Sequence, residues 1–136
     1  LRHTQYNQTS SDSSSLNSRT MAISGTIILI FIFIHLGFIW LTYQTHNFYI
    51  DETYYDVLLR SEIGYLNHTP TACFYIISIF LIGFHLKHGY NSSLKTLGLL
   101  NSGMSNVLYS IGFVFWGIIP AAFIIIVLSI QLGLIE

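Results

Sequence analysis

The chain has 136 residues, of which 52% are hydrophobic and only 8% are charged, whereas about a quarter of the residues of a soluble domain are charged. This composition indicates a membrane protein, and the net charge of −1 gives no sign of a nucleic-acid partner. The single cysteine, Cys73, excludes an internal disulfide and is too few for an iron–sulfur cluster.

Residues 1–20 are predicted to be a polar N-terminal arm, and residues 21–136 a transmembrane anchor. Residues 1–17 are rich in Ser, Thr, Asn and Gln and cannot bury enough apolar surface to fold alone. We expect them to form an extended arm on a partner or on the membrane surface; the alternative is a free tail. The first apolar run is too long for a signal peptide and is interpreted as a retained span.

Three apolar runs, at about residues 21–43, 71–97 and 107–132, are each long enough to cross the roughly 30 Å of hydrocarbon as a helix. The predicted fold is therefore an all-α membrane protein with three transmembrane helices. Pro70 marks the entry to the second span. Pro120 lies within the third, where it is expected to kink the helix. Residues 52–59, between the first two spans, are a candidate short surface helix.

The charges predict the orientation. The first loop carries four acidic residues and one basic residue, whereas Lys87 and Lys95, near the second connection, have no acidic neighbour. Because basic residues stay on the inner side, the N-terminus and the second connection are predicted to face inward, and the first loop and C-terminus outward.

The histidines of the second apolar run are the sequence feature that indicates a function. His85 and His88 lie one turn apart near the end of the second apolar run, and Gly89 follows directly. An ionisable ring in a membrane costs roughly 2–3 kcal/mol or more unless it faces a partner, a cavity or a metal. His-x-x-x-Gly followed by an amphipathic tail is typical of a haem-bearing helix. A zinc site is not completed, because only Cys73 could add a ligand from the same span.

His35 and His85 are predicted to lie at different depths in the membrane. Each lies 14 residues into its span, counted from Met21 and from Thr71 respectively, which is about 21 Å along the helix. The two spans run in opposite directions, so His35 is predicted in the outer half of the membrane and His85 in the inner half. A single iron would need both rings at one depth, so the chain offers one ligand to each of two levels.

The stretch FHLKHGYNSSLKTLGL resembles the haem-ligand helix of the cytochrome b membrane-anchor subunits of succinate dehydrogenase and fumarate reductase, respiratory complex II. SRTMAISG is similar to that family's helix entry at the quinone pocket, and FIFIHLGFIW to the helix that binds the distal haem in di-haem members. The similarity covers residues 17–132. It implies that His85, or alternatively His88, binds haem b, with His88 otherwise beside a propionate.

The resemblance also implies the remaining roles. His35 would bind a second haem in a di-haem complex and none in a mono-haem one. Arg19 and Ser24 would contact ubiquinone or menaquinone, or else serve as topological charge and helix cap. The chain would anchor the iron–sulfur and flavoprotein subunits and pass electrons from succinate to quinone, with no substrate chemistry of its own.

The chain differs from the di-haem anchors, which have five helices in one polypeptide. The resemblance therefore implies that the three spans are part of a larger helix bundle, in which a second small membrane subunit supplies the missing helices and haem ligands. The Ile-, Phe-, Tyr- and Asn-rich composition favours the mitochondrial inner membrane, with a bacterial cytoplasmic membrane as the alternative.

Two other functions are compatible with the sequence. One is a non-catalytic accessory subunit of another respiratory complex, whose histidines serve only structure. The other is a b-type cytochrome of a different oxidoreductase.

The predicted orientation can be tested with protease added to sealed, right-side-out membranes. Cleavage is expected within residues 45–70, because that loop faces outward, while the connection after Lys95 stays protected. Cleavage near Lys95 alone would reverse the orientation.

Overall fold

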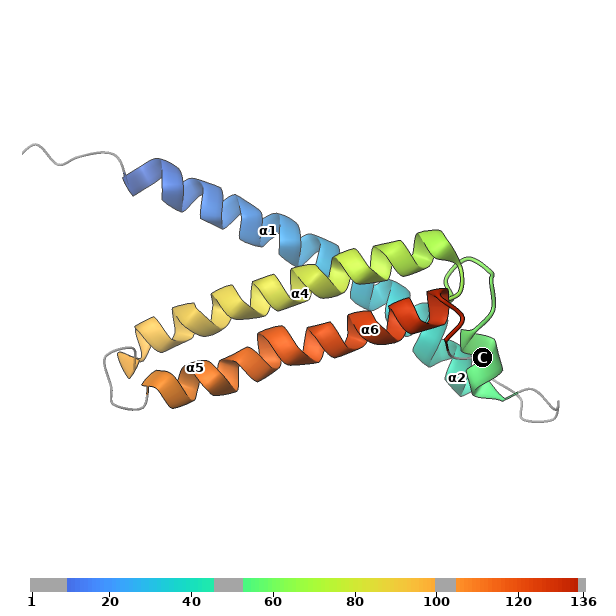
Figure 1. Ribbon diagram of the computed structural model, residues 1–136. Helices are drawn as coiled ribbons and strands as arrows, with labels where there is room; N and C mark the ends of the chain where they lie inside the picture. Colours follow the sequence, from blue (N-terminus) through green and yellow to red (C-terminus); the bar gives the residue numbers. More distant parts are fainter. Residues whose placement is uncertain (1–9, 46–52, 100–104, 135–136) are drawn as a thin grey trace, which may run out of the picture.

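The computed structural model describes residues 10–45, 53–99 and 105–134, and every regular element among them is helical (Figure 1). Three helices, Ser18–Thr45, Thr69–Thr96 and Ser105–Gln131, are long and apolar enough to cross a membrane. This result confirms the predicted all-α, multi-pass membrane protein, and the three helices overlap the predicted spans to within a few residues.

The first span is an almost continuous rod made of α1 (Ser10–His35), a π-helical turn η1 (Leu36–Trp40) and α2 (Leu41–Thr45). Residues 10–17 are helical, whereas the sequence predicted an extended arm there. Once a helix has nucleated, each added residue costs little, so the apolar span can extend outward into a polar segment. Residues 1–9 of the predicted arm lie outside the described residues.

The second span, α4 (Thr69–Thr96), is the central helix of the molecule. It begins with Pro70 in its first turn, as the sequence predicted, because proline lacks the N–H that would be unpaired there. It packs against α1 on one side and against the third span on the other. In Figure 1, α4 and the third span run side by side, whereas α1 crosses α4 and diverges from it toward the end where α4 finishes.

The third span consists of α5 (Ser105–Phe113), a π-helical turn η3 (Val114–Ile118) and α6 (Ile119–Gln131). Pro120 lies in the first turn of α6, directly after the π-helical turn. A proline cannot donate to the carbonyl one turn earlier, and a local π-helical turn is one way to accommodate that missing bond. A π-helical turn thus directly precedes Pro120, and the predicted kink stays a prediction.

The core forms where all three spans meet, and it is small and aromatic. It consists of Phe31 from α1, Val127 from α6, and Ala72, Tyr75 and Ile79 from α4. The Phe31 and Tyr75 rings meet edge to face with centroids 5.0 Å apart, an arrangement that aromatic pairs prefer.

A short cap covers the end of the bundle between the first two spans. It contains α3 (Tyr54–Leu58), inside the region predicted as a surface helix, and the loop to α4. The Thr53 hydroxyl and the Asp56 amide N–H are 3.3 Å apart, and the Thr53 hydroxyl and N–H both donate to the Asp56 carboxylate at 2.7 Å. These two bonds lower the pKa of the Asp56 carboxyl below its usual range.

Three hydrogen bonds attach the cap to the three spans. The Gly64 N–H donates to the Thr71 hydroxyl of α4 at 3.1 Å, and the Gln131 amide of α6 donates to the Leu66 carbonyl at 2.8 Å. The Tyr65 and Thr42 hydroxyls lie 3.5 Å apart, which links the cap to α2. Gly64 has a φ of +101° and packs on the Phe38 ring, so a side chain would be strained there.

Most of the apolar surface of the spans is not buried within this chain. Only 11%, 28% and 17% of the most hydrophobic windows of the first, second and third spans are buried. The remainder is available to lipid tails or to further helices, which are equally apolar surroundings for these residues.

We predict that Gly83 is required for the packing of α4 against the third span. A Cβ atom at Gly83 would lie 2.8 Å from the Trp116 carbonyl oxygen, which is backbone and cannot swing away. Gly83→Ala should therefore destabilise the protein by about 1–3 kcal/mol, the usual cost of overpacking. Thermal unfolding of the purified protein in detergent would measure this loss.

The matched control is Gly37→Ala, because a Cβ atom at Gly37 would meet nothing within 4 Å. This variant should unfold at or near the wild-type temperature. Equal stability of the two variants would contradict the assigned close contact.

Candidate functional site

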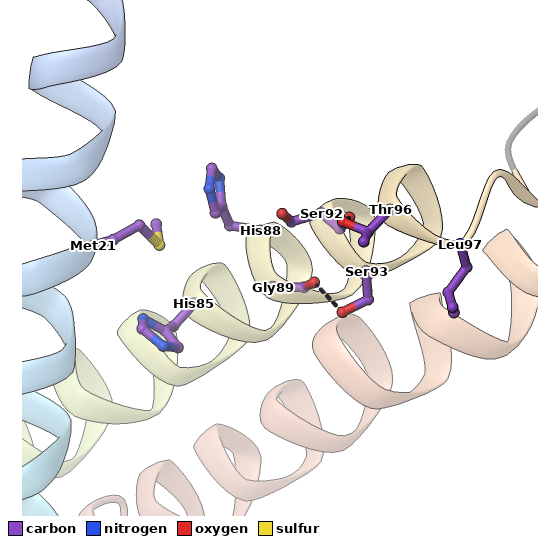
Figure 2. Close-up of a pocket in the computed structure, with 8 residues that line it drawn as sticks. All are labelled: Met21, His85, His88, Gly89, Ser92, Ser93, Thr96 and Leu97. Atoms are coloured by element: carbon purple, nitrogen blue, oxygen red, sulfur yellow. Dashed lines mark hydrogen bonds between the residues drawn. The ribbon is translucent and has the colours of Figure 1, made fainter.

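His85 and His88 line a cavity of about 610 Å³ on the face of α4 that looks toward α1 (Figure 2). The cavity lies where α1 diverges from α4, and its volume is within the roughly 300–1,000 Å³ of typical ligand sites. Met21 of α1 borders it on one side. The other lining residues come from α4 and the residue that follows it: His85, His88, Gly89, Ser92, Ser93, Thr96 and Leu97.

Helical spacing explains why these residues share one wall. Residues three and four apart lie on the same face of a helix, so His85, His88 and Gly89 are neighbours. His85 is half-buried between the helices and His88 is exposed. A Cβ atom at Gly89 would meet nothing within 4 Å, so this glycine keeps the wall beside His85 open.

Ser24 of α1 holds the His85 ring. It is 3% exposed, and its Oγ lies 3.2 Å from His85 Nδ1. The next residue, Gly25, also faces the ring, since a Cβ atom there would lie 3.7 Å from His85 Cε1. Two small residues on α1 therefore leave room for the imidazole between the helices and supply one hydrogen bond to it.

The hydrogen bonds of Ser24 favour one tautomer of His85. The Ser24 hydroxyl donates to the Met21 carbonyl at 3.1 Å, so its one proton is already used. With that bond in place, Ser24 Oγ can accept a hydrogen bond from His85 Nδ1–H. The tautomer that does so has an unprotonated Nε2, which is the form of histidine that binds a metal.

The remaining polar groups of the cavity lie toward the end of α4. The Ser93 hydroxyl donates to the Gly89 carbonyl at 2.9 Å, as Figure 2 shows, and the Thr96 hydroxyl donates to the Ser92 carbonyl at 3.1 Å. These two hydroxyls therefore face a ligand mainly as acceptors. His88 is the ionisable group at this end that could donate a proton or hydrogen bond to a carboxylate.

His35 belongs to a different cavity, so the structure does not bring it together with His85 or His88. Its ring stacks on Phe31 at a centroid distance of 5.6 Å and lies 5.9 Å from the Tyr75 ring. This second cavity, of about 360 Å³, lies among all three spans and is almost entirely apolar. No residue lines both cavities. The π-helical turn η1 begins directly after His35.

Arg19 and Ser24, predicted together as quinone contacts, do not face a common site. They are five residues apart on α1, which places them about 140° apart around a helix. Arg19 is exposed and lines neither histidine cavity, whereas Ser24 is buried against His85. A quinone contact by either residue remains a prediction.

A haem held in this cavity would take His85 as its ligand from this chain and would need its second ligand from another chain. His85 Nε2 is available as one axial ligand, and Gly89 leaves open wall beside it. Within residues 10–45, 53–99 and 105–134, no group of three or more His, Cys, Asp or Glu side chains could enclose a metal ion.

The contribution of Met21 and Gly25 was not predicted from the sequence. Ser24 was singled out, but for a quinone and not for His85. The Ser24–His85 contact could have been suggested by the depth estimate. Ser24 lies about 4.5 Å into the first span from its inner end, and His85 lies in the inner half of the second span.

Comparisons with models of protein families, with curated proteins and with solved structures found no match to this chain.

Proposed function

We propose that this chain is a cytochrome b membrane-anchor subunit of a succinate:quinone oxidoreductase, in which His85 is an axial ligand of haem b. The observation that carries the proposal is the 3.2 Å contact between His85 Nδ1 and Ser24 Oγ, which holds the ring by one nitrogen beside a cavity. The sequence resemblance supplies the family, and the geometry supports His85 over His88 as the ligand, because His85 is held and His88 is exposed.

Haem b, if bound, would supply one-electron transfer, and His85 would be the residue of this chain that holds it. The chain's own contribution is to hold the ligand ring. Ser24 fixes the tautomer and the orientation of His85, since the second nitrogen of a metal-binding histidine usually donates to such a partner. His88, at the polar end of the cavity, is placed to hydrogen-bond a propionate.

The geometry also suggests where the partners lie. The cavity is at the end of the bundle where α4 finishes and α1 begins, which is the end predicted to face inward (Figure 1). An iron–sulfur subunit docked there, carrying electrons from the flavoprotein, would be nearest to His85. The opposing ligand would come from a second membrane subunit or from further helices. In a di-haem complex, His35 and its separate cavity would serve the second haem, at a different depth in the membrane.

We expect the histidine variants to separate the haem sites. His85→Ala should remove or shift the b-type band of the haem near the iron–sulfur side, because the iron loses an axial imidazole. His88→Ala should have a smaller effect. The measurement is the reduced-minus-oxidised spectrum of the purified complex, together with succinate–quinone activity.

His35→Ala tests the number of haems. In a di-haem complex it should remove a second, separable b-type signal while the first survives. An unchanged spectrum would indicate that the complex holds only one haem. An unchanged spectrum in all three variants would reject the cytochrome function and leave a structural anchor, as in an accessory subunit of another complex.

Ser24→Ala tests the orienting role directly. Loss of an outer-sphere partner typically weakens a metal site by roughly 10- to 100-fold. The variant should therefore retain haem less firmly and shift its midpoint potential, while the protein still folds. Haem content and a redox titration of the purified complex would measure both effects.

Thr26→Ala is the matched control, because the Thr26 hydroxyl donates only to the Ala22 carbonyl of its own helix, at 2.9 Å on the exposed side. It should leave haem content and potential unchanged. If Ser24→Ala behaves like this control, the Ser24–His85 bond serves helix packing alone.

A further inference from the structure

A third cavity lies on the side of α4 that faces the third span, away from the site described above. It has a volume of about 330 Å³. The residues that line it come from α4 and from the middle of the third span: Phe80, Gly83, Phe84, Lys87, Trp116, Gly117, Pro120, Ala121 and Ile124. None of them lines the cavity of His85 or contacts that ring.

The shape of this groove follows from residue size. Gly83, Gly117 and Ala121 form its floor as small residues, and two aromatic side chains form a wall. Phe80 is 67% exposed and Phe84 is 44% exposed. Both lie within a membrane-spanning helix, so the groove opens on the surface that meets the lipid tails or another apolar partner.

Lys87 provides the charge. It is the only charged residue that lines the groove, and its ammonium lies 4.7 Å from the centroid of the Trp116 ring. A cation over an indole face is attracted by the negative face of the ring, and this contact holds the ammonium at one end of the groove. In the part of the chain that the structure describes, Lys87 has no acidic partner, so its charge remains to be balanced.

The groove has a polar end and an apolar end. Lys87 lies about 27 Å along the helix from Thr69. It is therefore near the edge of the roughly 30 Å of hydrocarbon on the side where α4 finishes, from where its long side chain can reach the lipid headgroups. Phe80 lies about 10 Å deeper, among the acyl chains.

We propose that this groove binds an anionic phospholipid from the leaflet at the α4–α5 end of the bundle. The Lys87 ammonium would pair with the phosphate, and one acyl chain would lie along Phe80, Phe84 and Ala121. The net negative charge of the lipid balances Lys87, which a zwitterionic lipid does not do, and anionic lipids are drawn to basic residues at this level. A further transmembrane helix is the less suitable occupant, because it would have to bury Lys87 without a partner.

The test uses Trp116 as a reporter of the lipid that touches it. The full chain, in the complex in which it purifies, is reconstituted into phosphatidylcholine vesicles that contain equal mole fractions of brominated phosphatidylglycerol or of brominated phosphatidylcholine. Bromine quenches an indole that it contacts. The Trp116 signal is the part of the indole fluorescence that is lost in Trp116→Tyr, which keeps an aromatic ring beneath Lys87.

Brominated phosphatidylglycerol is expected to quench Trp116 several-fold more effectively than brominated phosphatidylcholine. Lys87→Gln should reduce the quenching to the phosphatidylcholine level. Lys95→Gln, which removes a charge at the same end of α4 but outside the groove, should keep the preference. Ala121→Phe, which fills the groove and leaves the charge in place, should reduce quenching by both lipids.

Three results would overturn the proposal. Equal quenching by the two lipids in the wild type would remove the anionic preference. Quenching by neither would mean that protein covers the groove. An undiminished preference in Lys87→Gln would assign the selectivity to another group. Each comparison is made at equal haem content, because haem also quenches indole fluorescence.

Discussion

The packing of α1 against α4 depends on a hydrogen-bond partner for the His85 ring, a polar group that lies between two apolar helices. In hydrocarbon, water cannot hydrogen-bond an imidazole, so the ring must find a partner within the protein. His85 finds it across the helix interface, in the buried hydroxyl of Ser24. Gly25 beside Ser24 leaves the space that the ring needs. This contact gives the ring a hydrogen-bond partner, and in the tautomer with its proton on Nδ1 it leaves Nε2 unprotonated.

The central position of α4 makes this arrangement possible. α4 packs against both other spans, and the three helices share a small core around Tyr75. The cap closes the opposite end of the bundle by bonds to each span, including Gln131 to the Leu66 carbonyl. The first span is held at the core through Phe31 of α1 and at the cap through Thr42 of α2, and α1 diverges from α4 toward the far end, where the His85 cavity lies (Figure 1).

Much of this fold could be predicted from the sequence, because bilayer thickness sets the length of an apolar helix. The three spans, Pro70 at a helix start and the separate levels of His35 and His85 all follow from composition and a rise of 1.5 Å per residue. The helical extension of α1 to Ser10 could not be read from polarity, which does not prevent a helix from continuing. The partner of His85 was also missed, because its identity depends on the rotation of α1 about its axis, and length and depth say nothing about rotation.

The rotation of successive residues around a helix axis also explains how α4 presents two different polar groups to opposite neighbours. Two residues apart on a helix are about 200° apart around its axis, so His85 and Lys87 must point to nearly opposite sides of α4. The imidazole side meets the small residues of α1, and the ammonium side meets Trp116 of the third span. A basic side chain directed into the His85 cavity would repel a cation bound there. Lys87 lies two positions later, at nearly the same depth but on the other side of the helix. The spacing His-x-Lys thus separates the imidazole from the ammonium by rotation around α4, with little change of depth.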